Sequence, residues 1–329
     1  MNQKVYVACP ENQEIHVFTL STQGELSLVQ IVAVPGQVQP MVFSKNKSFL
    51  YVGIRPDFQV LSYAIAPESG ELSFAGSAPL LGSPTHIAID NTGKYFFSAS
   101  YSFNHVSICP ISQEGIVEAP IHTIEGICAP HSVNPISDSN TILIPALKED
   151  KIRVFNLANG TLIEADTAYM IQKGAGPRHI TFHNTKQIGY CLNELDSTIS
   201  TIKLPDENST LVDILQTHLS VPVDFNQTYW SADIHITPNN RFLYCSERTS
   251  SLLTAIELNS EGLINKTIGY YDTELQPRGF AIDTTGKFLI CAGQQSDKLS
   301  LYHIDQNSGE LLHRTQYSVG KGAMWVLIK

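Results

Sequence analysis

The stretch SPTHIAIDNTGKYFFSASY, residues 83–101, returns late in the chain as QPRGFAIDTTGKFLICAGQ, residues 276–294. Each copy has an alternating apolar segment, a polar turn that ends in Thr-Gly-Lys, and a second segment rich in aromatic and aliphatic residues. Alternation with a period of two is typical of a half-buried strand, and the glycine-containing turn indicates that the two strands pair as a hairpin. The sequence therefore contains a repeated β-hairpin.

Four further segments follow the same pattern: VQPMVFSKNKSFLYVGIR (38–55), APHSVNPISDSNTILIPALK (129–148), GPRHITFHNTKQIGYCLNE (176–194) and SADIHITPNNRFLYCSER (231–248). Each copy is followed by a third apolar segment, a polar turn such as PESGEL or QNSGEL, and a fourth segment. A repeat of roughly 46 residues with four strands is typical of a β-propeller blade. The six copies therefore predict six blades.

The two ends of the chain supply the halves of one more blade. The C-terminal GKGAMWVLIK (320–329) is a first strand without a second, and the N-terminal KVYVAC (4–9) is a second strand without a first. Joining them closes the ring and removes two exposed sheet edges. We therefore predict one all-β domain over residues 1–329, a seven-bladed β-propeller with four antiparallel strands per blade. Two separate sandwiches would leave the matching half-blades unexplained.

Composition limits the classes of partner. Of the 329 residues, 43% are hydrophobic and 16% charged, and the net charge is −10 with no Lys/Arg-rich run, which argues against a nucleic-acid or anionic-membrane surface. The N-terminus lacks a signal peptide pattern and no apolar run is long enough to span a membrane, so we expect a cytoplasmic protein. Six scattered cysteines without a CxxC pair predict reduced thiols and no zinc site.

Propeller geometry predicts where polar residues gather. The innermost strand of each blade lines the central channel, and its start opens on the same face as the end of the second strand. Aligned on their turns, the starting positions hold Gln39, Thr85, His131, Arg178, Ala232, Arg278 and Met324, followed by Pro40, His86, Ser132, His179, Asp233, Gly279 and Trp325. The ends of the second strands hold Arg55, Tyr101, Lys148, Glu194, Arg248, Gln294 and Pro10.

Arginine is concentrated at these positions in an otherwise acidic chain. Four of the seven arginines occupy them: Arg55, Arg178, Arg248 and Arg278. Arginine binds carboxylate and phosphate groups through two parallel hydrogen bonds. Together with His131 and Glu194, the arginines predict an anion pocket that contains a titratable group. No recurring His-x-His or Asp-x-Asp spacing, P-loop or Gly-x-Ser-x-Gly motif accompanies them, so we expect no metal and no cofactor.

Simpler structural roles compete with these functional ones. A histidine at a strand end is usually a hydrogen-bonded structural residue, which is the preferred interpretation of His86, His179 and His235. Glu194 is equally well explained as a structural partner of an arginine. Blade order separates Arg55 from the other arginines, so we expect a solvated charge there, and we expect Trp325 to pack at the rim.

The segments GQVQPMVFS, GAGPRHITFH, YCLNEL, QPRGFAID and GKGAMWV, in this order, resemble the bacterial seven-bladed propeller family of 6-phosphogluconolactonases. The resemblance covers essentially the whole chain. It implies a cytoplasmic enzyme without cofactor that hydrolyses 6-phospho-D-glucono-1,5-lactone to 6-phosphogluconate. It implies a small phosphorylated sugar lactone as the partner, with no nucleic acid, membrane or protein partner. A fungal carboxymuconate-lactonizing enzyme with the same fold uses a histidine, two arginines and a glutamate.

Carried over to this chain, the resemblance implies that His131, Arg178 and Glu194 are catalytic and that Arg248 is the second arginine. We expect His131 to activate water, Arg178 to stabilise the oxyanion, and Glu194 to orient its neighbours. The remaining expected substrate contacts are Arg248 and Arg278 as a phosphate clamp, with His179, Asp233, Lys148 and Gln294. Glu247 stands where many members of the fold family have asparagine, which affects the expected shape of the pocket.

Two alternatives remain open at the level of sequence. The same scaffold suits a cycloisomerase or a lactonase for an unphosphorylated sugar acid, which a comparison of lactones with and without the 6-phosphate would separate. A non-enzymatic interaction platform is also built on this architecture, because a fold does not fix an activity. That alternative predicts aromatic or apolar residues on the channel face, where the sequence places mostly charge.

Overall fold

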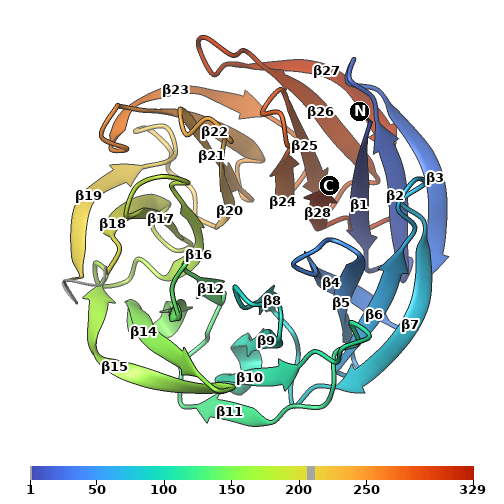
Figure 1. Cartoon of the computed structure of the whole chain (residues 1–329). Helices are drawn as coiled ribbons and strands as arrows, with labels where there is room; N and C mark the ends of the chain where they lie inside the picture. Colours follow the sequence, from blue (N-terminus) through green and yellow to red (C-terminus); the bar gives the residue numbers. More distant parts are fainter. Residues whose placement is uncertain (1, 206–211) are drawn as a thin grey trace.

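The computed structural model describes residues 2–205 and 212–329. Seven four-stranded antiparallel sheets stand around a central channel, with the two chain ends in neighbouring strands (Figure 1). Apart from short 3₁₀ turns at Tyr101–Phe103 (η1) and Leu147–Glu149 (η2), the described residues form strands and connections without an α-helix. The predicted seven-bladed propeller with four antiparallel strands per blade is therefore confirmed.

The innermost strands surround the channel (Figure 1). They are β4 (Gln37–Phe43), β8 (His86–Ile89), β12 (Asn134–Pro135), β16 (Pro177–Phe182), β20 (Ser231–Ile236), β24 (Pro277–Ile282) and β28 (Trp325–Ile328). The second strands are β5 (Phe49–Arg55), β9 (Tyr95–Ser100), β13 (Thr141–Ala146), β17 (Ile188–Asn193), β21 (Phe242–Glu247), β25 (Phe288–Gly293) and β1 (Gln3–Cys9). Below, each blade is called by its innermost strand.

The two outer strands of each blade complete the sheets. The third strands are β6 (Gln59–Ile65), β10 (His105–Pro110), β14 (Lys151–Ala158), β18 (Thr198–Lys203), β22 (Leu252–Leu258), β26 (Lys298–Ile304) and β2 (Glu14–Leu20). The fourth strands, on the perimeter in Figure 1, are β7 (Leu72–Pro79), β11 (His122–Glu125), β15 (Thr161–Met170), β19 (Asp213–Leu219), β23 (Ile264–Asp272), β27 (Leu311–Ser318) and β3 (Leu26–Ala33).

The repeated turn that reveals the fold is built around an aspartate. The Oδ1 atom of Asp90 accepts hydrogen bonds from the amides of Lys94 and Tyr95, both at 2.8 Å. Asp283 binds the corresponding amides of the β24 blade in the same way. Gly93 occupies the left-handed region at φ +75°, where a side chain would be strained. The Asp-x-Thr-Gly-Lys spacing therefore specifies the hairpin directly.

Ring closure occurs as the half-blades predicted. Strand β1 pairs with β28, from Val5 opposite Ile328 to Ala8 opposite Trp325. The backbone amide of Lys4 also donates to the carbonyl of Lys329 at 2.9 Å. The chain ends thus share one sheet, and β28 covers the edge of β1 that would otherwise be unpaired.

The core consists of apolar side chains packed between neighbouring sheets. Buried tyrosines on second strands add a polar tie between blades, because a buried phenol hydroxyl requires a hydrogen-bond partner. Tyr6 donates to the carbonyl of Gly70 at 2.8 Å, and Tyr244 donates to that of Gly309 at 2.7 Å. Each of these glycines lies in the outer turn of the next blade. The blades are therefore held in a fixed angular relation, which fixes the channel face.

Candidate active site

Bulges at the start of the innermost strands position the arginines. Pairing of β16 with β17 shifts register between Pro177 and His179, so Arg178 is the extra residue. Strand β24 has the same shift between Pro277 and Gly279, around Arg278. A bulge leaves the extra residue outside the ladder and redirects its side chain. This local distortion, repeated two blades apart, aims both arginines at the same mouth of the channel.

Glu194 is the centre of the cluster. It follows β17, where its amide donates to the carbonyl of Gly176 at 2.7 Å. Its Oε2 atom accepts a hydrogen bond from Arg178 Nε at 2.7 Å and lies 3.3 Å from Arg248 Nη2. The same oxygen lies 3.7 Å from His131 Nε2, too far for a direct hydrogen bond. The structure thus brings the four residues of the predicted site together.

The cluster holds more positive than negative charge. Burial would raise the pKa of Glu194, but the charges of Arg178 and Arg248 outweigh it and lower that pKa. Burial and the nearby Arg178 lower the pKa of Arg248 to about 8, and the same causes lower that of Arg278 to about 10. Because guanidinium groups keep their proton in proteins, these shifts express crowding of cations around one carboxylate. An added anion would relieve it.

Arg178 is the most deeply enclosed of the arginines. Its side chain is 1% exposed, and besides Glu194 it donates to the carbonyl of Ala232 in the next blade. Ser132 in turn donates its hydroxyl to the carbonyl of Arg178 at 2.8 Å. Arg178 therefore links three blades, and its charge is buried beneath the channel mouth.

Arg248 is covered by an aromatic residue that sequence reasoning missed. The guanidinium lies 3.9 Å from the ring centroid of Trp230, and its Nε atom donates to the Trp230 carbonyl at 3.1 Å. The backbone amide of Trp230 donates to Glu247 at 2.6 Å, so the departure from asparagine at that position has a structural use here. Trp230 precedes β20, outside the aligned repeat, and only its proximity to SADIHI (231–236) could have drawn attention to it.

His131 lies on the inner side of the cluster. It is 5% exposed, its amide donates to the carbonyl of Pro145, and its ring meets that of Tyr101 edge to face with centroids 5.7 Å apart. Burial and the charge of Arg178 hold the pKa of His131 well below its usual value. The imidazole is therefore neutral at pH 7 and able to accept a proton.

His179 and Asp233 lie behind His131, toward the channel. The ring of His179 meets that of His131 at a centroid distance of 5.2 Å, and its Nδ1 atom is 2.9 Å from Asp233. Asp233 also binds His235 Nε2 at 3.0 Å. Burial would raise the pKa of Asp233, but the neighbouring His235 and His179 lower it well below its usual value. Burial together with Arg178 lowers the pKa of His179 to about 4.

Aromatic rings fill the channel at this level. The ring of His86 meets those of His179 and Trp325 at 5.4 and 5.8 Å, and the rings of His179 and Trp325 are 6.1 Å apart. Trp325 thus packs against two histidine rings. Beyond this layer lies a cavity of about 320 Å³ that His86, His179, Asp233 and Trp325 help to line. Both His179 and Asp233 therefore face the channel interior.

The other expected contacts surround the cluster less tightly. Arg278 is half-buried and forms no side-chain hydrogen bond or ion pair with the described residues. Lys148 is exposed, with its Nζ atom 5.6 Å from the ring of Tyr101. Gln294 is half-buried, and its backbone amide donates to the carbonyl of Gln276. Arg278 is thus the arginine with most freedom to bind an external anion.

The expectation that Arg55 is a solvated loop charge was wrong. Its side chain is partly buried and donates from Nη2 to the carbonyl of Pro84 at 3.1 Å. After burial and Arg178, its charge is the next cause of the lowered pKa of Arg278. Ring closure brings the β4 blade near the β24 blade, which linear blade order had obscured.

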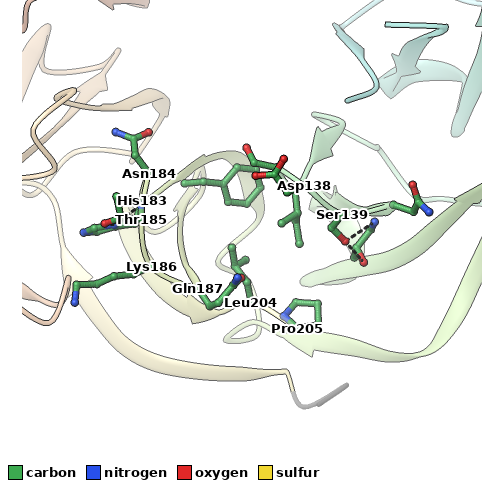
Figure 2. Close-up of a pocket in the computed structure, with 14 residues that line it drawn as sticks. Asp138, Ser139, His183, Asn184, Thr185, Lys186, Gln187, Leu204 and Pro205 are labelled. Carbon is green, nitrogen blue, oxygen red and sulfur yellow. Dashed lines mark hydrogen bonds between the residues drawn. The ribbon is translucent and has the colours of Figure 1, made fainter. Parts of the chain in front are cut away.

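A larger hollow, of about 750 Å³, lies on the opposite face of the ring. Figure 2 shows its lining, including Asp138 and Ser139 from the β12–β13 turn and His183 and Lys186 from the β16–β17 turn. None of the predicted site residues contributes to it. Its size alone does not make it the reaction site, because the charged cluster lies on the other face.

Within residues 2–205 and 212–329, no three His, Cys, Asp or Glu side chains are grouped to hold a metal ion. The same residues contain no helix that is long and apolar enough to cross a membrane.

Comparison with known proteins agrees with the fold. A 6-phosphogluconolactonase of Yersinia pestis is 50% identical over 331 residues, which cover 100% of this chain and 98% of that protein. The enzyme of the same name from Yersinia enterocolitica is 51% identical with the same coverage. The solved periplasmic gluconolactonase of Pseudomonas aeruginosa superposes with a TM-score of 0.92 over 100% of this chain and 99% of that one, at 22% identity.

The family described as "Lactonase, 7-bladed beta-propeller" matches residues 4–328. That range takes in all seven blades and every residue of the charged cluster. The chain therefore belongs to the seven-bladed β-propeller lactonase family.

Proposed function

We propose that this protein hydrolyses 6-phospho-D-glucono-1,5-lactone to 6-phospho-D-gluconate. The observation that carries the proposal is the excess of arginine around Glu194, next to a neutral His131, in a chain half identical to proteins named 6-phosphogluconolactonase. The substrate carries a dianionic phosphate and develops a further negative charge on its carbonyl oxygen during hydrolysis. A cationic pocket with a neutral base suits both demands.

In the proposed reaction, His131 Nε2 accepts a proton from a water molecule as the water oxygen attacks the lactone carbonyl carbon. The C–O bond of the ring then breaks, and the departing ring oxygen takes the proton back from His131. Glu194 already accepts a hydrogen bond from Arg178 and lies 3.3 Å from Arg248, so we assign it to orienting the arginines and the neighbouring ring of His131. Water and lactone together account for every atom of the product.

We assign stabilisation of the oxyanion to Arg178 and binding of the phosphate to Arg278, with Arg248 contributing charge. Arg178 uses Nε and Nη1 to bind Glu194 and Ala232, which leaves Nη2 without a hydrogen bond to the described residues. Arg248 is held under Trp230, so it is less free than Arg278 to follow a phosphate group. We assign Lys148 and Gln294 to the rim of the site.

His179 and Asp233 were expected to touch the substrate, but their contacts favour a different role. Asp233 fixes the Nδ1 atom of His179, whose ring supports His131 from the channel side. We therefore assign them to positioning His131 rather than to binding. In this proposal Asp233 keeps His179 in one tautomer, as a carboxylate does for a histidine it binds.

A rate assay with freshly generated lactone, corrected for spontaneous ring opening, tests the proposed activity. The value of kcat/KM should be higher for 6-phosphogluconolactone than for gluconolactone. The difference should come chiefly from KM, because the phosphate contacts are made in both the ground state and the transition state. An equal kcat/KM for both lactones would contradict the assignment of arginines to the phosphate. It would favour a lactonase for an unphosphorylated sugar acid.

A cytoplasmic location also remains a proposal. All six cysteines are unpaired, and five of them, Cys9, Cys109, Cys191, Cys245 and Cys291, are buried. Unpaired buried thiols are typical of proteins from reducing compartments. Cell fractionation with an antibody to the protein would test the location.

A further inference from the structure

Trp230 contacts both signs of charge in the cluster through different parts of its indole. The Nε1 atom donates to Glu194 Oε1 at 3.2 Å, while the ring lies over the guanidinium of Arg248 at 3.9 Å. A hydrogen bond to a carboxylate and a stacked guanidinium are each stronger than their neutral counterparts. The edge and one face of the indole are therefore held by side chains, and the bond from its backbone amide to Glu247 holds the residue in place.

The remaining part of the side chain is accessible. Trp230 is 37% exposed, whereas Arg248 beneath it is only 5% exposed. A large aromatic group left accessible beside a charged cluster is unusual, because aromatic side chains contribute most when they are buried. Small-molecule sites combine such apolar surfaces with a few directed polar groups.

We propose that Trp230 is the aromatic wall of the substrate site, packing its free face against the ring of a sugar lactone. This inference rests on the proposed function. The C–H bonds of a pyranose ring form an apolar face that matches an aromatic surface, while the carbonyl and phosphate reach the neighbouring cations. Because Trp230 also holds Glu194 and Arg248, it sets the distance between the wall and the charged groups.

The test uses the stable product, 6-phosphogluconate, and the intrinsic fluorescence of the protein. The chain contains two tryptophans, Trp230 and Trp325, so Trp230→Phe leaves Trp325 as the only indole. Saturating product should change the emission of the wild type, and the change should be lost in Trp230→Phe. Calorimetric titration of the same samples reports binding without relying on either tryptophan.

Kinetics separate a substrate contact from a purely structural role. A stacked ring acts in the ground and transition states alike, so Trp230→Phe should raise KM about twofold and Trp230→Ala about tenfold, with kcat largely kept. The matched control is Tyr229→Phe, in the same loop, whose ring packs on Phe225 at 5.4 Å. It should leave KM and kcat at wild-type values.

The outcomes distinguish the two proposals. Product binding by calorimetry without any change in wild-type emission overturns the role of Trp230 and leaves the proposed function intact. A Trp230→Phe protein that retains its thermal stability but loses kcat at unchanged KM also overturns it. If the wild type neither binds product nor hydrolyses the lactone, both proposals fall together.

Discussion

Replacing Glu194 by Gln should destabilise the fold measurably. The carboxylate is the nearest negative charge to Arg178 and Arg248, whose side chains are 1% and 3% exposed. Removing one partner of a buried ion pair typically costs about 3–5 kcal/mol. Because Gln keeps an oxygen that can accept from Arg178, we expect about 3 kcal/mol, the lower end of that range.

A chain of this length unfolds with an entropy of roughly 0.7 kcal/mol/K, so 3 kcal/mol corresponds to a Tm lowered by about 4 °C. Differential scanning calorimetry at pH 7 measures it directly. The matched control is Glu164→Gln, which also removes a carboxylate from an arginine, but from an exposed pair. An exposed pair contributes at most about 1 kcal/mol, so that variant should lose no more than about 1.5 °C.

The effect of Glu194→Gln should depend on pH with a definite sign. The folded pKa of Glu194 is below its ordinary value, so its contribution is present above the unfolded pKa and is lost as pH falls through the folded pKa. The difference in Tm between wild type and variant should therefore be full at pH 7 and shrink as the pH falls well below 4.5. A variant as stable as the wild type at pH 7 would refute the reasoning.

Four further predictions follow from the same contacts. Because the pKa of His131 lies well below 6.5, kcat/KM should be flat from pH 8 to pH 6.5 and fall only at lower pH; a midpoint near 6.5 in the pH profile would contradict this. Arg278→Ala should raise KM for the phosphorylated lactone at least about tenfold and leave gluconolactone unaffected, as expected for a lost charged hydrogen bond; equal losses for both substrates would count against a phosphate contact. Asp233→Asn should lower kcat with KM kept and shift the acid limb of the pH profile, whereas an unchanged profile would assign Asp233 a structural role only. Gly279→Ala should lower stability by about 1–3 kcal/mol in denaturant titrations, since its Cβ would lie 2.4 Å from the carbonyl oxygen of Met324, and an unaffected midpoint would show that β28 can move.

The fold was predictable because short-range sequence signals specify the hairpin in each blade. The turn aspartates and glycines, such as Asp90 and Gly93, specify the hairpin through backbone bonds within a few residues. The half-blades at the chain ends indicated closure, and β1 pairs with β28 accordingly. Register within the repeats was also sufficient to place Arg178, Glu194 and Arg248 at one mouth.

What the sequence did not reveal depends on contacts between blades. The bulges at Arg178 and Arg278 change register by single residues, which hydrophobic alternation does not resolve. Arg55 was separated from Arg278 by counting blades along a line, although the ring brings them close. Trp230 lies one residue before the segment SADIHI (231–236), and the residues at the same position in other blades, such as Ser83 and Gln276, gave no signal of an aromatic contact.

The arrangement of charge explains why the proposed site would bind an anion although the chain is acidic. Arg178 and Arg248 share the single carboxylate of Glu194, while Arg278 has no ion-pair partner among the described residues. Burial prevents solvent from screening this surplus, and the lowered pKa values of Arg248 and Arg278 express its cost. A bound phosphate would remove that cost at the same place where hydrolysis creates an oxyanion. The surplus charge therefore stabilises the transition state of the proposed reaction and, by the same interaction, destabilises the empty protein.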